Sequence, residues 1–124
     1  MSQDIIADTL NQMRNAKKAG KETVSVIRYS KLLLSVLAIA KLRDYVKNYR
    51  VENNVLNIEL GKLNDCKAIK PRFIVSVEDI EKYISRYLPA KDIGILIVST
   101  SRGLMTHQTA QDKNLGGSLI AYFY

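Results

Sequence analysis

Hydrophobic residues in the first third of the chain follow helical spacing and then strand spacing. Apolar side chains recur every three or four residues between positions 5 and 13, which predicts an amphipathic helix. We expect Ser2 to cap this helix and Gly20 to end it. Residues 23–29 are rich in β-branched and aromatic side chains, so a strand should follow the helix.

A second helix and a β-hairpin complete the predicted N-terminal lobe. Ser30 can cap a helix over residues 31–43, which is so apolar that it should be central to this lobe. Two strand-like segments, residues 46–52 and 55–60, flank Asn53-Asn54, and asparagine tolerates the positive φ of a tight hairpin turn. Residues 1–65 are therefore expected to form a lobe of helix, strand, helix, strand, strand.

Shorter elements are predicted in the C-terminal half, residues 66–124, after a polar, turn-like segment over residues 61–67. The sequence predicts a short strand over residues 73–75 that begins after Pro71, and a short helix over residues 80–87. The fold class is thus α+β with two small lobes, the second built of short strands and one or two short helices.

An unbroken apolar run over residues 95–98, bounded by Gly94 and a hydroxyl cluster, predicts a strand that is buried on both faces. It ends in a hydroxyl-rich segment, Ser99-Thr100-Ser101-Arg102-Gly103, which we expect to be a surface loop. Thr106 is placed to cap a helix over residues 107–113, whose N–H groups would point at the loop and favour an anion such as phosphate. A last strand, residues 118–124, should pair with residues 95–99.

Composition favours a polyanionic partner and argues against several other classes of protein. The net charge is +7 with a sequence pI near 9.6. The two halves carry +4 (11 Lys/Arg, 7 Asp/Glu) and +3 (8 Lys/Arg, 5 Asp/Glu), so neither is a basic tail. Cys66 is the single cysteine and His107 the single histidine, which predicts no intrachain disulfide and no metal site built from these residue types. No apolar stretch has the length of a membrane span.

A hydrolase would have to use Ser99 or Ser101 as nucleophile and His107 as base. The segment lacks the Gly-x-Ser-x-Gly pattern of a nucleophile elbow, and nothing near His107 marks an orienting carboxylate. Phosphate-binding nucleotide motifs such as Gly-x-Gly-x-x-Gly are absent as well. We therefore expect neither an enzyme nor a cofactor.

Several motifs resemble one family along essentially the whole chain. They are Ser99-Thr100-Ser101-Arg102-Gly103-Leu104-Met105-Thr106-His107, Leu115-Gly116-Gly117, the final Leu119-Ile120-Ala121-Tyr122-Phe123-Tyr124, and near the N-terminus Ala7-Asp8, Arg14-Asn15-Ala16 and Ser30-Lys31. Together they are similar to the small-subunit ribosomal protein eight family. Ser118 stands where bacterial members usually have Glu, and with His107 this resembles the archaeal branch.

The resemblance implies a non-enzymatic component of the small ribosomal subunit that binds the central domain of its rRNA, at a hairpin with an irregular internal loop, early in assembly. Neighbouring ribosomal proteins would be the other partners, and the chain would be a monomer within a cytoplasmic ribosome, without membrane, metal or small-molecule substrate. The implied RNA-binding residues are Ser99, Thr100, Ser101, Arg102, Gly103, Met105, Thr106, His107, Gly116, Gly117, Arg14, Asn15, Ser30 and Lys31. Hydroxyl groups suit this role because they both donate to and accept from ribose 2′-OH groups and base edges. The imidazole of His107 is expected to face the RNA.

The alternative is a DNA-binding or regulatory protein that uses the helix over residues 31–43. The apolar content of that helix argues against it, because a helix that reads a DNA groove must expose polar side chains.

Overall fold

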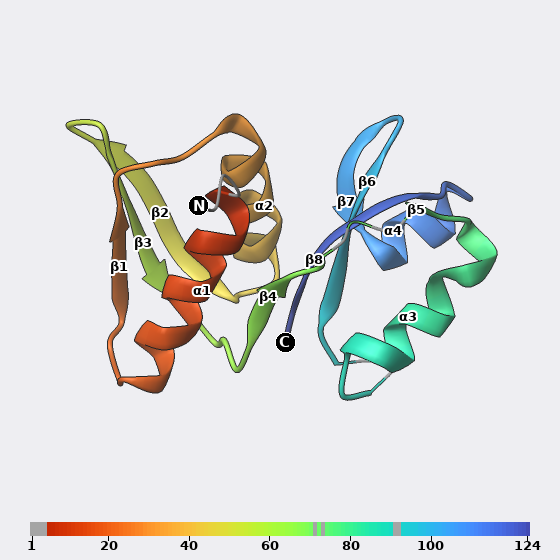
Figure 1. Cartoon of the computed structure of the whole chain (residues 1–124), viewed down its shortest axis with the longest axis horizontal. Coiled ribbons are helices and arrows are strands. Elements are labelled where there is room, and N and C mark those ends of the chain that lie inside the picture. Colours follow the sequence, from red (N-terminus) through yellow and green to blue (C-terminus); the bar gives the residue numbers. More distant parts are fainter. Residues whose placement is uncertain (1–4, 71, 73, 91–92) are drawn as a thin grey trace. The chain divides into compact units, whose positions relative to one another are not determined.

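The computed structural model describes residues 5–70, 72, 74–90 and 93–124, and the chain divides into two compact units, residues 1–67 and 68–124 (Figure 1). The expected helix cap Ser2 and the strand positions Pro71 and Phe73 lie outside the described residues.

Two helices and three strands form the first unit, in the predicted order. They are α1 (Ile5–Lys18), β1 (Thr23–Val26), α2 (Lys31–Leu42), β2 (Val46–Glu52) and β3 (Val55–Leu60). The strands form an antiparallel sheet in the order β1-β3-β2. Asn53 and Asn54 have φ of 52° and 63°, which confirms the hairpin turn predicted between β2 and β3.

The core of the first unit comes from one face of each element. Leu10 and Met13 of α1 and Leu33 and Leu37 of α2 are fully buried. In β3, buried and half-buried residues alternate, so every second side chain faces the core. The strongly apolar α2 is therefore a core helix, as its sequence indicates.

Among the described residues, the second unit and its junction with the first contain five strands, two α-helices and one 3-10 turn. They are β4 (Cys66–Ala68), β5 (Ile74–Val75), η1 (Val77–Asp79), α3 (Ile80–Tyr87), β6 (Ile95–Thr100), β7 (Gly103–Thr106), α4 (His107–Asp112) and β8 (Gly117–Phe123). The strand order is β4-β8-β6-β7, and β5 also pairs with β8. This mixed α+β architecture confirms the predicted fold class.

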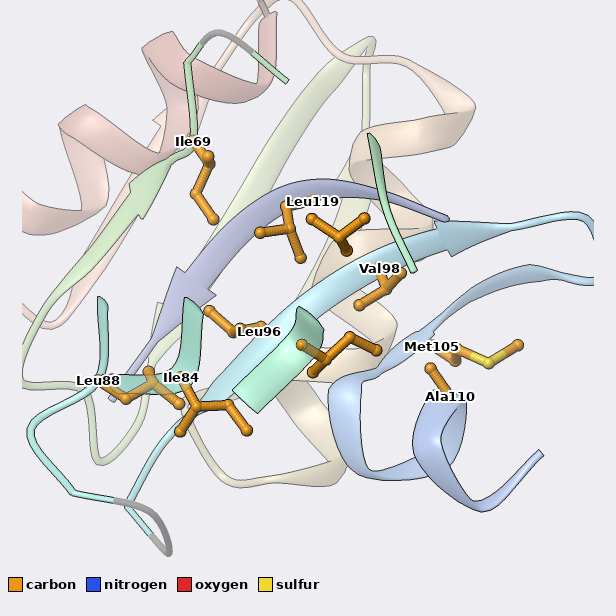
Figure 2. Close-up of a cluster of buried hydrophobic side chains, with 10 residues drawn as sticks. Ile69, Ile84, Leu88, Leu96, Val98, Met105, Ala110 and Leu119 are labelled. Atoms are coloured by element: carbon orange, nitrogen blue, oxygen red, sulfur yellow. The ribbon is translucent and has the colours of Figure 1, made fainter. Parts of the chain in front are cut away.

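β6 and β8 form the centre of this sheet. Ile95 of β6 lies opposite Phe123 and Ser99 lies opposite Ser118, which confirms the antiparallel pairing predicted for the last strand. Side chains of one sheet face gather with α3 and α4 in a buried apolar cluster that includes Leu96, Val98, Met105 and Leu119 (Figure 2).

The short strands β7 and β4 were not predicted from the sequence. Of the loop expected over residues 99–103, Ser99 and Thr100 belong to β6 and Gly103 begins β7, which pairs with β6 from Thr100–Gly103 to Ile97–Thr106. Residues 66 and 67, expected to belong to a polar turn, begin the strand β4. Both strands are short, and a strand of three or four residues has too little local pattern to be distinguished from a loop.

Candidate nucleic-acid interface

The hydroxyl-rich segment forms the end of the β6–β7 hairpin, which extends beyond the helices of its own unit (Figure 1). We call residues 100–103 the hairpin tip. Ser101, Arg102 and Gly103 are exposed, whereas Ser99 and Thr100 are half-buried. The tip thus presents one hydroxyl and one guanidinium group to solvent on a rigid two-stranded support.

Thr100 fixes the shape of the tip through its side-chain hydroxyl. The Oγ1 atom accepts a hydrogen bond from the backbone N–H of Arg102 at 3.0 Å. The same hydroxyl donates to the carbonyl oxygen of Gly103 at 2.9 Å. Because its only proton is used within the protein, Thr100 positions its neighbours and is not free to donate to a ligand.

Three glycines near the tip have two different functions. Gly103 has a φ of +105°, and a Cβ there would meet no atom of the protein, so it is needed for its backbone conformation. A Cβ on Gly117 would collide with the carbonyl oxygen of Ser99, and one on Gly116 would lie 2.5 Å from that of Val75. Gly116 and Gly117 therefore let β5, β6 and β8 approach closely.

Three of the predicted RNA-binding residues are buried. Met105 and Thr106 are each 7% exposed, and His107 is 1% exposed. Nδ1 of His107 accepts a hydrogen bond from the backbone N–H of Leu96 at 3.1 Å. The prediction that this imidazole faces RNA is wrong, because the side chain connects α4 to β6 inside the unit.

The predicted anion site at the start of the last helix also changes. Thr106 caps α4 as expected, since its hydroxyl accepts from the N–H of Thr109 at 3.3 Å. However, α4 spans only six residues and follows β7, so it does not begin at the hairpin tip.

The four remaining predicted residues lie in the first unit. Ser30 caps α2, since its Oγ accepts from the N–H of Leu33 at 3.2 Å. Arg14 forms a partly buried ion pair with Asp65, with 2.7 Å between Nε and Oδ1. Asn15 and Lys31 are exposed. Arg14 and Ser30 thus have structural roles within the protein, whereas Asn15 and Lys31 present their side chains to solvent.

Some exposed lysines of the first unit form hydrogen bonds with other residues of that unit. The sequence did not predict these bonds. Lys17 donates through Nζ to the carbonyl oxygen of Gly61 at 3.2 Å. Lys41 donates to the amide oxygen of Asn48 at 3.4 Å. These contacts connect residues that are 44 and 7 positions apart, so they follow from the fold and not from local sequence.

The described residues contain no cluster of three or more His, Cys, Asp or Glu side chains suited to a metal ion. Within the same residues, none of the helices combines the length and the apolar character that crossing a bilayer requires. Cys66 is buried, and burial raises the pKa of its thiol to about 12.

The structure thus combines two antiparallel α+β units with a hairpin tip that exposes the hydroxyl of Ser101, while the nearby His107 is buried. The family described as Ribosomal protein S8 has a sequence model that matches residues 4–124. The chain is 41% identical to the small ribosomal subunit protein uS8 of Nanoarchaeum equitans (strain Kin4-M) over 129 residues, which cover 100% of both chains. It is 43% identical, with the same coverage, to the uS8 protein of Archaeoglobus fulgidus.

The chain therefore belongs to the ribosomal protein S8 family and is a structural component of the small ribosomal subunit. The family resemblance seen in the sequence is confirmed, including its archaeal character, because both relatives are archaeal.

Proposed function

We propose that the chain binds the central domain of small-subunit rRNA directly and helps to nucleate its assembly in the cytoplasm. Residues 66–124 would form the rRNA-binding lobe, and neighbouring ribosomal proteins would be further partners. The observation that supports this most strongly is the exposed Ser101 at a hairpin tip whose shape is fixed by Thr100.

The proposed mechanism separates affinity from selectivity. Exposed cations such as Lys31 and Arg102 attract the phosphate backbone, and this attraction does not depend on sequence. The hydroxyls of Ser99 and Ser101 contact ribose 2′-OH groups and base edges of an irregular helix, whose minor groove is wide and shallow. Because the hairpin is pre-shaped, little conformational entropy is lost when it docks.

Replacement of Ser101 by alanine tests this function. We expect the variant to lose about 1–3 kcal/mol of discrimination between the irregular rRNA helix and a regular duplex, if the hydroxyl contacts a base. Titration of both RNAs at one salt concentration measures the difference. Ser85→Ala is the matched control, because Ser85 is an exposed serine on α3 of the same unit. Equal losses on both RNAs would exclude Ser101 as a selectivity determinant.

The DNA-binding alternative gains little support from α2. Leu33, Val36, Leu37 and Ala40 are fully buried, so much of the helix is committed to the core. The exposed Ser35 donates its hydroxyl proton to the carbonyl oxygen of Lys31 at 3.1 Å. Few groups remain on this helix to read base edges. Competition between duplex DNA and rRNA at matched salt would reveal a preference for DNA.

A further inference from the structure

β1 and β2 are the two edge strands of the first sheet, and their edges differ in how they are protected. An exposed edge presents unpaired N–H and C=O groups to other chains, and proteins usually block it with charges, prolines or bulges. In β2 the register shifts around the exposed Lys47, and the amide oxygen of Asn48 accepts from the N–H of Tyr49 at 2.9 Å. β1 has the sequence Thr-Val-Ser-Val, with a regular register and no charged residue. The edge of β1 therefore lacks the features that protect β2.

Thr23 and Ser25 direct their backbone N–H and C=O groups away from β3. The carbonyl oxygen of Glu22 accepts from the N–H of Leu60 at 2.8 Å, so these two opposed residues form a hydrogen-bonded pair. In an antiparallel ladder such pairs alternate with pairs that form no hydrogen bond with each other. Thr23 and Ser25 belong to the second kind. Within the described part of the chain β1 pairs only with β3, so the backbone groups of both residues remain available at the edge of the sheet.

A groove runs along this edge between β1 and α1, which lie side by side (Figure 1). Its volume is about 440 Å³. The strand side consists of Lys21 and residues 23–25, and the helix side includes the small residues Ala16 and Ala19. Because these side chains are short, α1 leaves space beside the backbone of β1. We call this space and its continuation along the two elements the β1 groove.

The β1 groove continues into a smaller pocket of about 110 Å³ near the end of β1. Gln12 lines both spaces, and Ile5, Val26 and Ile27 line the smaller one. Ile27 is 78% exposed. Since an apolar cavity of about 150 Å³ accommodates benzene, the smaller pocket has room for a small apolar side chain such as that of valine.

An extended peptide suits the β1 groove better than other ligands. The main chain of an added strand supplies donors and acceptors at the spacing of the free edge. A nucleic acid fits less well, because the outward carbonyl oxygens of Thr23 and Ser25 repel phosphate oxygens. A second copy of the chain also fits less well, because it would bring its own α1 to the same sheet face. Neighbouring strands lie roughly 4.8 Å apart, whereas packed helices need about 8–10 Å.

We propose that an extended segment of a neighbouring protein in the subunit binds in the β1 groove and adds a fourth strand to the three-stranded sheet. A small apolar side chain of this segment packs against Ile5 and Ile27. Lys21 lines one end of the groove, and Asp8 and Arg28 line the other, so an acidic residue of the segment next to Lys21 completes the match. The segment binds independently of the proposed rRNA contact, because the hairpin tip lies in the second unit.

A designed peptide probes the β1 groove in the full-length protein. The probe is acetylated and amidated Asp-Thr-Val-Thr-Val-Thr-Asp, and its control carries N-methyl groups on the central Val-Thr-Val, which then cannot donate from the main chain. At saturation we expect the probe to slow hydrogen exchange of the Thr23 and Ser25 amides at least about tenfold, and the control to have no effect. Absence of protection at these two amides, or equal protection by both peptides, would overturn the inference.

Ser25→Pro removes the outward N–H without removing a bond to β3, and proline is tolerated at such edge positions. Ser25→Ala is the matched control, because both variants lose the hydroxyl that donates to Asn57 at 2.7 Å and only proline loses the N–H. We expect the affinity for the probe to fall on the order of tenfold for Ser25→Pro and less than about twofold for Ser25→Ala. Equal affinities of the two folded variants would contradict strand addition. The peptide comparison on the wild-type protein decides the question if Ser25→Pro does not fold.

Photo-cross-linking in reconstituted small subunits identifies the occupant. The cross-linker replaces Ser25, and Lys47 is the control position, because it is exposed on the protected edge of the same sheet. We expect position 25 to cross-link to an extended segment of another protein, and position 47 not to cross-link to that segment. Cross-links from position 25 only to rRNA or to a second copy, or none at all, would overturn the inference and leave the proposed contact of Ser101 with rRNA untouched.

Discussion

Single hydroxyl groups in the hairpin tip have different tasks although they are adjacent in the sequence. Ser101 is exposed, whereas the hydroxyl of Thr100 donates to Gly103 and accepts from Arg102. Serine and threonine offer the same donor and acceptor groups, so residue type alone does not distinguish these roles. Only the folded hairpin decides which hydroxyl is exposed and which forms hydrogen bonds within the tip.

Substitutions of Thr100 should separate its hydroxyl from its methyl group. Thr100→Val keeps the side-chain volume but loses two hydrogen bonds, each worth about 1 kcal/mol, so the tip should lose its fixed shape. We expect weaker binding of the irregular rRNA helix, with Thr100→Ser retaining most of it. Titration of that helix with the three proteins measures the effect. If valine and serine variants bind alike, Thr100 does not position the tip.

The raised pKa of Cys66 predicts how the free energy of unfolding depends on pH in the alkaline range. Its pKa is raised from 9.0 to about 12 in the folded protein, because burial disfavours the thiolate. The folded state therefore holds the proton more strongly than the unfolded state between these values. The resulting stabilisation is complete below pH 9 and is lost as the pH rises towards 12.

A comparison with Cys66→Ala isolates this contribution from the other groups that titrate at alkaline pH. We expect the free energy of unfolding of the wild-type protein to fall more steeply than that of the variant, by up to about 1.4 kcal/mol per pH unit. Urea unfolding from pH 8 to pH 11 measures both slopes. Parallel curves would mean that Cys66 ionises equally easily in both states.

At the scale of elements, Gly116 and Gly117 show how neighbouring strands pack closely together. The hairpin of β6 and β7 keeps its place in the sheet because β8 approaches β6 closely at Gly117. Gly103 serves the hairpin in a different way, through a φ of +105° that other residues rarely adopt. One glycine is required by steric contact and the other by backbone conformation.

Alanine substitutions should distinguish the two requirements. Gly103→Ala should cost about 1–2 kcal/mol, the penalty of a left-handed conformation for a residue with a Cβ. Gly117→Ala should cost more, because its Cβ would meet the backbone of Ser99 and force β8 away from β6. Thermal unfolding of both variants ranks the losses. A smaller loss for Gly117→Ala would show that the strands separate easily at this position.

The net charge is a property of the whole molecule. The net charge of +7 is divided almost evenly between the two halves of the sequence. Some of the cations are used inside the protein, as Arg14 with Asp65 and Lys17 with Gly61 show. Formal charge therefore overstates the number of cations that can contact phosphate.

Lys31 is expected to be one of the phosphate contacts, since it is exposed at the start of α2. Lys31→Ala should weaken binding of the irregular rRNA helix and of a regular duplex alike. It should also lower the slope of log affinity against log salt concentration by about one. Titrations at several salt concentrations measure the slope. Lys41→Ala is a useful control, because Lys41 already donates to Asn48. An unchanged slope for Lys31→Ala would exclude a phosphate contact.

The sequence by itself determined the helices, the longer strands and the family. Apolar periodicity over α1, α2 and β3 and the Asn53-Asn54 turn are local signals, because each is set by neighbouring residues within one element. The hydroxyl-rich segment over residues 99–103 and the paired glycines Gly116-Gly117 were likewise recognisable in the sequence from their residue types and spacing.

Only the tertiary structure decided which of the motif residues reach solvent. β7 depends on pairing with β6, the buried imidazole of His107 accepts a hydrogen bond from the N–H of Leu96, and Ile74 is in register with Ser99 only through β8. Each of these features depends on a partner in another element, and a local pattern contains no information on that partner. Folding therefore decides which of the chemically suitable residues are exposed.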